Sequence, residues 1–264
     1  MVEDSTLDDI PKDGQCSHSR LSGPAFLLGE PTMETVDVED AIRMRRSIRE
    51  FKAGEKIPDE VIERILDAAR YAPSPENMQM WRYIVIREDQ DLKKYIADIS
   101  QEMAARTFGS APYEATTGRL WWLGDPRRAS TYDVMKDGEL FRYPETADTI
   151  VIGLASGAHQ DSGSYYALEL FGSVVVGMGM LQMWLVAHKL ELGCAYQAFP
   201  FSDPRHSELI CDRIGIPRTW VPLALLALGV PQEKRMLGPS RWPMEGVMFS
   251  ERWGNPYTRL AFRK

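Results

Sequence analysis

The segment from Phe171 to Ala187 contains no charged residue in 17 positions, and no other stretch constrains the fold of this chain as strongly. This length only just reaches that of a bilayer-spanning helix, and three glycines and a glutamine interrupt the apolar run. A buried helix inside a globular oligomer explains the segment better than a membrane span does. We expect this helix in the interface of a homodimer, because an exposed apolar patch of this size would make a monomer prone to aggregate.

The overall composition is that of a globular protein, with 264 residues, 44% hydrophobic residues and a net charge of −7. Nucleic-acid binding needs a basic face, so the acidic balance argues against a nucleic-acid partner. Three scattered cysteines fit reduced thiols in a cytoplasmic protein better than a disulfide framework or a zinc site. The N-terminus shows no basic region followed by an apolar stretch, so we expect no signal peptide.

The hydrophobic periodicity after residue 34 predicts alternating helices and strands in one domain, residues 35–264. The expected helices cover 36–47, 58–70, 89–103, 165–190 and 204–214, and the expected strands cover 81–86, 150–154 and 220–230. Gly193 follows the long helix at the position of a C-cap. Residues 1–34, rich in Asp, Ser, Gly and Pro, form either a disordered tail or an N-terminal arm that packs on a partner subunit.

Three arginines and a hydroxyl group lie within five residues, at Arg45, Arg46, Ser47 and Arg49. Guanidinium groups match the geometry of a phosphate, and serine adds a short hydrogen-bond donor. The pattern therefore favours a phosphate-binding site. A solvated basic turn at a helix end, stabilised by the helix dipole, would have the same sequence.

Two further segments have side chains that suit a flat heterocyclic ligand. In the Pro-rich turn 72–81, Asn77 and Gln79 can both donate and accept hydrogen bonds, and the prolines make the turn rigid. In the segment 185–198, an apolar helix end is followed by small residues as far as Ala198, and small residues let a backbone N–H approach a planar ring. Each segment could also be an ordinary connection between two elements.

Taken in their order and spacing, these segments resemble the nitroreductase family. RRSIREF is similar to the family's phosphate motif, APSPENMQMW to its A-P-S-x-x-N-x-Q-P-W turn, and LVAHKLELGC to its L-A-A-x-x-L-G-L-G-S helix end. WVPLALLALGVP resembles the family's late central strand, and residues 241–247 and 251–254 resemble its closing R-x-P-L-E-E-V and W-G segment. The resemblance covers roughly residues 36–254 apart from 106–147, and Met80 replaces the usual proline of the turn.

The resemblance implies an α+β fold, a three-layer sandwich with a mixed, mainly antiparallel sheet flanked by helices, in a domain-entwined homodimer. It implies two FMN sites at the dimer interface, each built from both chains. The residues implied to bind FMN are Arg45, Arg46, Ser47, Arg49, Pro73, Ser74, Asn77, Gln79, Ala198 and Arg241. The first three and Arg241 would hold the phosphate and ribityl end, Arg49 would face the O2 side of the ring, and the Ala198 N–H would approach N5. Some of the residues from the turn would come from the other subunit.

The resemblance also implies the reaction. NAD(P)H would deliver a hydride to the flavin and leave before a nitroaromatic, quinone or similar small acceptor binds, in a ping-pong mechanism. The flavin would carry the chemistry, so we expect no catalytic side chain and no metal. One alternative is a specialised flavoenzyme of the same superfamily: a reductive dehalogenase such as iodotyrosine deiodinase, a flavin-cleaving enzyme, or a dehydrogenase or oxidase. The other is a non-catalytic flavin-binding protein.

The stretch 106–147 shows no clear periodicity, and long irregular stretches in compact domains are usually functional or mobile. We expect a lid over the open face of the flavin, with Trp121, Trp122 and Tyr132 among the side chains that stack on a flat substrate. Tyr143 belongs to the same expected set. The alternative is a surface insertion that packs only on its own core.

Overall fold

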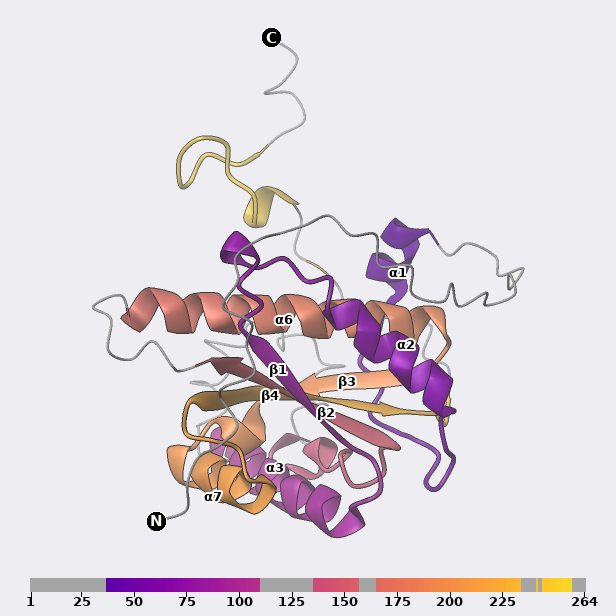
Figure 1. Ribbon diagram of the computed structural model, residues 1–264. Coiled ribbons are helices and arrows are strands. Elements are labelled where there is room, and N and C mark those ends of the chain that lie inside the picture. The colour runs from indigo at the N-terminus through magenta and orange to yellow at the C-terminus, as the bar shows by residue number, and fades with distance from the viewer. Residues whose placement is uncertain (1–36, 110–134, 157–164, 234–240, 242–243, 258–264) are drawn as a thin grey trace, which may run out of the picture. The chain divides into compact units, whose positions relative to one another are not determined.

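The computed structural model describes residues 37–109, 135–156, 165–233, 241 and 244–257, with only the backbone of 165–170. Figure 1 shows the helices α1 (Val38–Met44), α2 (Asp59–Ala69), α3 (Gln90–Gly109), α6 (Tyr165–Lys189) and α7 (Pro204–Ile214). The strands are β1 (Trp81–Ile86), β2 (Thr149–Ser156), β3 (Gly193–Gln197) and β4 (Trp220–Gly229). Short 3-10 turns cover Pro75–Asn77, Glu139–Phe141, Phe199–Phe201 and Met244–Gly246. The expected N-terminal arm, residues 1–34, lies outside the described residues.

The four strands form one sheet in the order β1-β2-β4-β3. Each neighbouring pair is antiparallel, with Trp81 opposite Ala155 and Gly193 opposite Gly229 at the ends of two ladders. We expected a mixed, mainly antiparallel sheet, and the described strands are antiparallel throughout. The central strand β2 is almost entirely buried, which explains its continuous apolar sequence.

Two layers of helices cover the two faces of the sheet, α6 and α2 on one face and α3 and α7 on the other (Figure 1). The alternation of side chains along β2 assigns them to two cores. Ile150 and Ile152 pack in the core that includes Ile96 of α3, whereas Val151 packs in the core that includes Ile65 of α2 and residues of α6. This arrangement confirms the expected three-layer α+β sandwich. The domain-entwined homodimer concerns a second chain and stays a prediction.

Helix α6 is buried on one side and exposed on the other. Val176 and Met183 are almost fully buried against the sheet, whereas an apolar stripe faces outward. This outer stripe consists of Phe171, Val174, Met178 and Leu181, each between 41% and 46% exposed. Residues Phe171–Lys189 are long and apolar enough to cross a membrane by length and composition, but their inner side forms one layer of the core. The expectation of a buried helix is therefore correct for the inner side, and the outer stripe requires another explanation.

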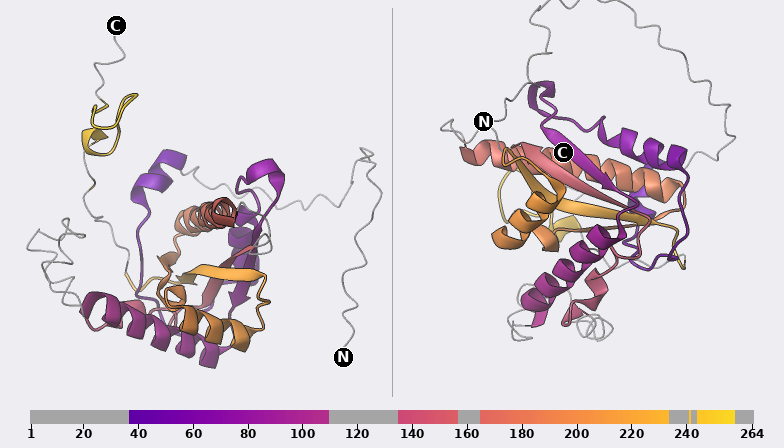
Figure 2. Two further views of the ribbon diagram at one scale, coloured as in Figure 1. Left: turned by 90° about the vertical axis from the view of Figure 1, so that its left-hand side faces the viewer. Right: turned by 60° about the horizontal axis from the view of Figure 1, so that its bottom comes forward.

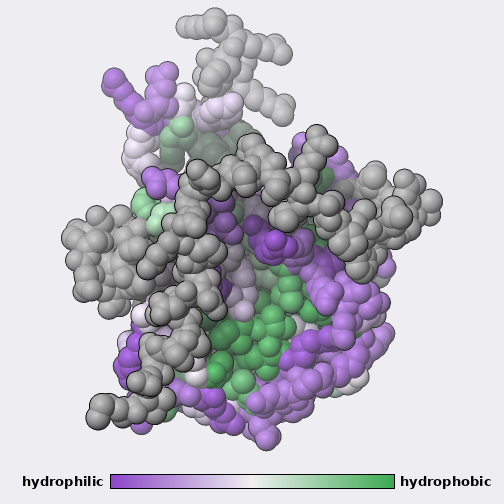
Figure 3. All heavy atoms as spheres, in the orientation of Figure 1, coloured by the Kyte–Doolittle hydropathy of each residue, from purple (hydrophilic) through white to green (hydrophobic). Residues whose placement is uncertain are grey.

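Apolar surface is not confined to α6. Figure 3 shows hydrophobic side chains at the centre of one face, over the sheet, with hydrophilic surface along its right-hand and lower borders. Strand β1 is an edge strand, and its Val85 is 39% exposed. Edge strands with exposed apolar side chains favour association with further chain segments.

The predicted C-cap at Gly193 is wrong. Helix α6 ends at Lys189, and the left-handed residue after it is Glu191, with φ 59°. The N–H of Leu192 donates to the carbonyl of Ala187 at 2.9 Å, the hydrogen bond that closes a helix end of this type. Gly193 instead opens β3, where a β-carbon would lie 3.0 Å from the ring of Phe51. Its small size serves close packing, and the small residues that follow the helix form a strand.

Both ends of the stretch 106–147 belong to the body of the fold. Residues 106–109 are the last turn of α3, which is longer than the expected helix. At the other end, Phe141 and Tyr143 are buried in the core beside α3, so Tyr143 does not stack on a substrate. The remaining candidate residues of the lid, Trp121, Trp122 and Tyr132, lie outside the described residues, and the lid stays a prediction for them.

Candidate functional site

The arginine-rich segment begins where α1 ends. Arg45 caps the helix with φ −54° and ψ 135°, so the chain turns away there and continues as an irregular segment. Two contacts hold this segment in place. The N–H of Ile48 donates to the carbonyl of Cys194 in β3 at 3.0 Å, and the indole Nε1–H of Trp184 in α6 donates to the carbonyl of Arg46 at 3.3 Å. All five residues from 45 to 49 are half-buried as a result.

Arg241, far along the chain, lies close enough to Arg45 for its charge to act there. Burial lowers the pKa of Arg45, and the positive charges of Arg241 and Arg46 lower this pKa further. Burial also lowers the pKa of His188, the next-to-last residue of α6, and the neighbouring charges of Arg46 and Arg45 act in the same direction. We call Arg45, Arg46, His188 and Arg241 the basic cluster. Because like charges at short range repel, an anion among these groups would stabilise them.

The side chain of Arg46 also shapes the turn after α1. Its Nη1 donates to the main-chain carbonyls of Arg43, at 2.7 Å, and of Arg45, at 2.8 Å. Its buried Nε has no hydrogen-bond partner among the described residues. A buried donor without a partner is costly, so this atom is suited to a ligand oxygen.

The Pro-rich turn is exposed and strained. Glu76, Asn77 and Gln79 all have positive φ, between 50° and 57°, and they are three of the five non-glycine residues with positive φ in the described chain. The hydroxyl of Ser74 accepts a hydrogen bond from the N–H of Gln79 at 3.1 Å, which closes the turn. Pro73, Asn77 and Gln79 face solvent in the single chain. Strain of this kind is concentrated at binding sites in proteins, which fits the predicted role of the turn.

The residues predicted for the ring end lie near the end of β3. The guanidinium of Arg49 lies 6.0 Å from the centre of the Tyr143 ring. Gln197 is 3% exposed; its amide donates to the carbonyl of Phe141 at 3.2 Å, and its Oε1 has no hydrogen-bond partner among the described residues. Ala198 follows directly, half-buried, at the start of the 3-10 turn Phe199–Phe201. Sequence reasoning missed Gln197 because it did not recognise β3.

One chain does not bring all the predicted FMN residues together. The basic cluster and Arg49 lie where α1 meets the C-terminal end of α6. In the left-hand view of Figure 2, which looks along α6, α1 lies on one side of this helix and the 3-10 turn Pro75–Asn77 on the other. Figure 1 likewise places α1 above the right-hand end of α6 and the turn farther left. A single chain therefore presents two separate halves of the predicted site.

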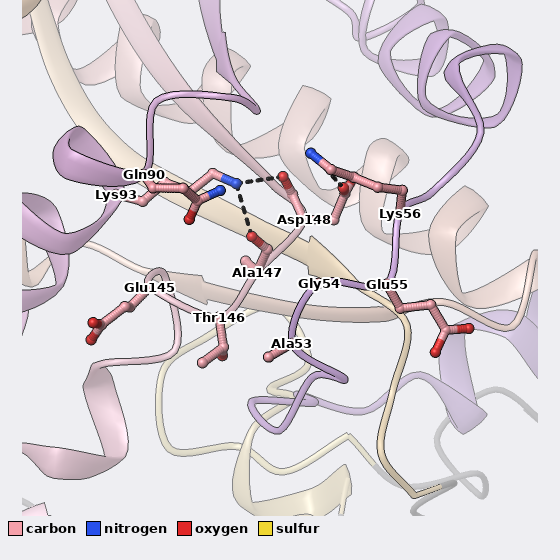
Figure 4. A pocket seen from close by; sticks show the side chains of 10 residues that line it. All are labelled: Ala53, Gly54, Glu55, Lys56, Gln90, Lys93, Glu145, Thr146, Ala147 and Asp148. Carbon is pink, nitrogen blue, oxygen red and sulfur yellow. Dashed lines mark hydrogen bonds and ion pairs between the residues drawn. The ribbon is translucent and has the colours of Figure 1, made fainter.

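A polar pocket with a volume of about 230 Å³ lies elsewhere, between the loop 53–56, the start of α3 and residues 145–148 (Figure 4). None of its ten lining residues is among the predicted FMN residues. Figure 4 shows Lys93 directed at the main-chain carbonyls of Ala147 and Asp148, and Lys56 directed at the Asp148 carboxylate. In the described part of the chain, no group of three or more His, Cys, Asp or Glu side chains could hold a metal ion.

Comparison with known proteins assigns the fold to a family. Residues 42–230, more than half of the chain, match the sequence model of the nitroreductase family. The chain belongs to the nitroreductase family. An NADH dehydrogenase of Thermus thermophilus is 28% identical over 83% of this chain and 98% of its own length. An iodotyrosine deiodinase of Nematostella vectensis is 28% identical over 61% of this chain and 71% of its own length. A 59-residue match, 44% identical, covers 30% of an NADH dehydrogenase/NAD(P)H nitroreductase of Methanothermobacter thermautotrophicus.

Solved structures have the same fold. A nitroreductase of Desulfovibrio desulfuricans in complex with FMN superposes with a TM-score of 0.58 at 21% identity, over 83% of this chain and 99% of that protein. The NADPH:FMN oxidoreductase of Vibrio harveyi, complexed with NAD⁺, gives a TM-score of 0.59 at 20% identity, over 83% of this chain and 79% of that protein. These similarities agree with the three-layer sandwich described above.

Proposed function

We propose that this oxidoreductase of the nitroreductase family binds FMN and uses NAD(P)H to reduce nitroaromatic, quinone or similar small acceptors. The observation that carries the proposal is the basic cluster: Arg46 has a buried Nε without a hydrogen-bond partner among the described residues, and the positive charges of Arg241 and Arg46 act on Arg45. Such a cluster is stabilised by a bound phosphate, since guanidinium–phosphate hydrogen bonds are charge-assisted. The FMN and NAD⁺ bound to two structural neighbours support the same cofactors here.

The chain's own residues suit the two ends of this cofactor. The basic cluster and Ser47 would hold the phosphate, and Arg49 would place a positive charge near the N1–C2=O edge of the ring. A positive charge at that edge favours the reduced flavin. The chemistry that this cofactor would supply is hydride transfer from NAD(P)H and electron transfer to the acceptor, in ping-pong order. The Ala198 N–H, directly after β3, would approach the ring from its N5 side. We also propose that the protein is located in the cytoplasm.

A second copy of the chain would complete the site. The turn of Pro73, Ser74, Asn77 and Gln79 is exposed and lies on the other side of α6 from the basic cluster. The outer stripe of α6 is apolar and exposed. Packing this stripe against a second α6 would remove it from water and bring the turn of one chain toward the basic cluster of the other. We therefore propose a homodimer with two composite FMN sites.

The chromophore of the purified protein tests the cofactor. We expect a yellow protein with about one FMN per chain, identified by extraction and chromatography against FMN and FAD standards. Recovery of FAD, or a colourless protein whose apo-form takes up no FMN, would contradict the proposal. Steady-state oxidation of NADH and NADPH with added nitroaromatics and quinones then separates an enzyme from a non-catalytic flavin-binding protein.

A second candidate function is reductive dehalogenation. Matches to iodotyrosine deiodinases, such as the 28% identity over 61% of this chain, favour it. Titration of the oxidised flavin with a halotyrosine, followed by absorbance, distinguishes the two functions. Saturable binding together with halide release by the reduced protein would favour the dehalogenase.

A further inference from the structure

Trp184 in α6 makes two different contacts with the same short segment. Its indole Nε1–H donates to the carbonyl of Arg46 at 3.3 Å. The face of its ring carries the guanidinium of Arg45, whose central carbon lies 4.2 Å from the ring centre. The two contacts hold consecutive residues, and both residues lie after the end of α1 in a segment that is neither helix nor strand.

The hydrogen bond to Arg46 determines the direction of the next main-chain donor. In a trans peptide the carbonyl of one residue and the N–H of the next point in opposite directions. Because the indole of Trp184 binds the carbonyl of Arg46, the N–H of Ser47 points away from α6. In the described part of the chain, neither this N–H nor the Ser47 hydroxyl has a hydrogen-bond partner. Both are donors that an anion can use.

The Trp184 ring stacks on the guanidinium of Arg45, a group whose positive charge is disfavoured by its surroundings. Burial, Arg241 and Arg46 all disfavour the charged form of Arg45. An aromatic face attracts a guanidinium through its quadrupole, so the Trp184 ring offsets part of this repulsion. It also fixes the plane of the guanidinium, which determines how the group can meet a phosphate.

We infer that Trp184 is a positioning residue of the anion site: it directs the Ser47 N–H outward and supports the Arg45 guanidinium before a phosphate binds. Trp184 itself does not need to touch the ligand. The inference rests on the proposed function for the identity of the ligand, FMN, but the geometry applies to any phosphate group. Preorganised donors bind more tightly because less ordering is left for the binding step.

Two variants separate the two contacts of Trp184. Trp184→Phe keeps an aromatic face and removes the indole N–H, whereas Trp184→Leu removes both. Tyr95→Leu is the matched control, because the guanidinium of Arg213 stacks 4.5 Å from the Tyr95 ring in a different part of the fold. The readout is the dissociation constant of the apoprotein for FMN and for riboflavin, which lacks the phosphate, measured by quenching of flavin fluorescence.

We expect Trp184→Phe to weaken FMN binding about fivefold, and Trp184→Leu roughly tenfold or more, since each lost contact is of the order of one hydrogen bond. The affinity for riboflavin should stay unchanged, as should both affinities of Tyr95→Leu. A general loss of structure would instead weaken the binding of FMN and of riboflavin equally. An unchanged ratio of the two affinities in Trp184→Phe would overturn the inference while leaving the proposed function intact.

If the wild-type protein takes up no flavin, the proposed function fails, and inorganic phosphate becomes the probe. Phosphate should then raise the thermal unfolding temperature of the wild type and of Tyr95→Leu, and raise that of Trp184→Phe by clearly less. An equal rise in the wild type and in Trp184→Phe, or no rise in the wild type, would overturn the role of Trp184.

Discussion

The ammonium group of Lys93 is fully buried and donates to the main-chain carbonyl of Asp148 at 2.7 Å and to that of Ala147 at 3.0 Å. The Asp148 carboxylate, also buried, accepts hydrogen bonds from Arg87 and from the hydroxyl of Thr149. A lysine of α3 thus ties this helix to the start of the central strand β2. Burial lowers the pKa of Lys93, while the negative charge of Asp148 opposes this effect.

Replacing Lys93 with methionine should lower the free energy of unfolding by about 1–3 kcal/mol, because two buried carbonyls lose their donor. Lys94→Met is the control: Lys94 is exposed and pairs with Asp98 one turn away, so its loss should cost less than about 0.5 kcal/mol. Denaturant unfolding of both variants measures the difference. Equal stabilities would mean that the Lys93 hydrogen bonds contribute nothing net.

The outer stripe of α6 can be tested with two residues of the same helix. Met178 is 41% exposed on the stripe, whereas Val176 is 1% exposed and packs against the sheet. Met178→Lys should leave the fold intact by circular dichroism and shift the protein to a monomer with weakened FMN binding. Val176→Lys should unfold the chain, because it buries a charge in the core. A Met178→Lys protein that stays dimeric by light scattering would remove the stripe from the proposed interface.

The long helices and strands could be predicted from the sequence, whereas the five-residue strand β3 could not. β1 lies at the expected position because it is rich in aromatic and β-branched residues, and α7 does so because Pro204 marks its start. β3 has only five residues, Gly193–Gln197, and three of them are Gly, Cys and Ala, whose small side chains give no strand signal. The strand forms because it pairs with β4 over its whole length, which is a tertiary cause that no local pattern contains.

The candidate site was also predictable only in part. The arginines of the segment 45–49 stand out in the sequence by charge alone. Trp184 does not, since a tryptophan in an apolar helix is indistinguishable from a core residue until its indole N–H is seen to bind Arg46. The strain at Glu76, Asn77 and Gln79 was equally hidden, because none of these residues is a glycine.

Replacing Arg46 or Arg241 of the basic cluster with alanine should weaken the binding of the FMN phosphate. We expect Arg241→Ala and Arg46→Ala each to cost about 1.5–3 kcal/mol of FMN binding, the range for a hydrogen bond to a charged group. This corresponds to roughly 10- to 150-fold in the dissociation constant. Riboflavin binding should change much less, and Arg106→Ala, which removes an exposed helix-surface arginine, should change neither. Unchanged FMN affinity in both cluster variants would show that the phosphate binds elsewhere.

The stability of the apoprotein should depend on pH through His188. Burial, Arg46 and Arg45 lower the pKa of His188 below its ordinary value of 6.5. Below pH 6.5 the unfolded chain binds a proton at this residue more readily than the folded chain does, so stability rises with pH between the lowered pKa and 6.5. His188→Gln should flatten this rise in denaturant melts between about pH 5 and 7. An identical pH profile in wild type and variant would contradict the assignment.

The lid is best tested with boundaries taken from the fold. Met135, Phe141 and Tyr143 are core residues, so a deletion must spare the segment from 135 onward. Residues 110–134 include Trp121, Trp122 and Tyr132, whose rings could cover a flat acceptor. We replace 110–134 with a short Gly/Ser linker and expect FMN to stay bound while reoxidation by nitroaromatic or quinone acceptors slows or changes in specificity, measured by stopped-flow absorbance. The matched variant Trp121→Ala/Trp122→Ala should show part of the same effect without a change in chain length. Unchanged reoxidation rates for all acceptors, with the flavin in place, would identify 110–134 as an insertion without a role in substrate choice.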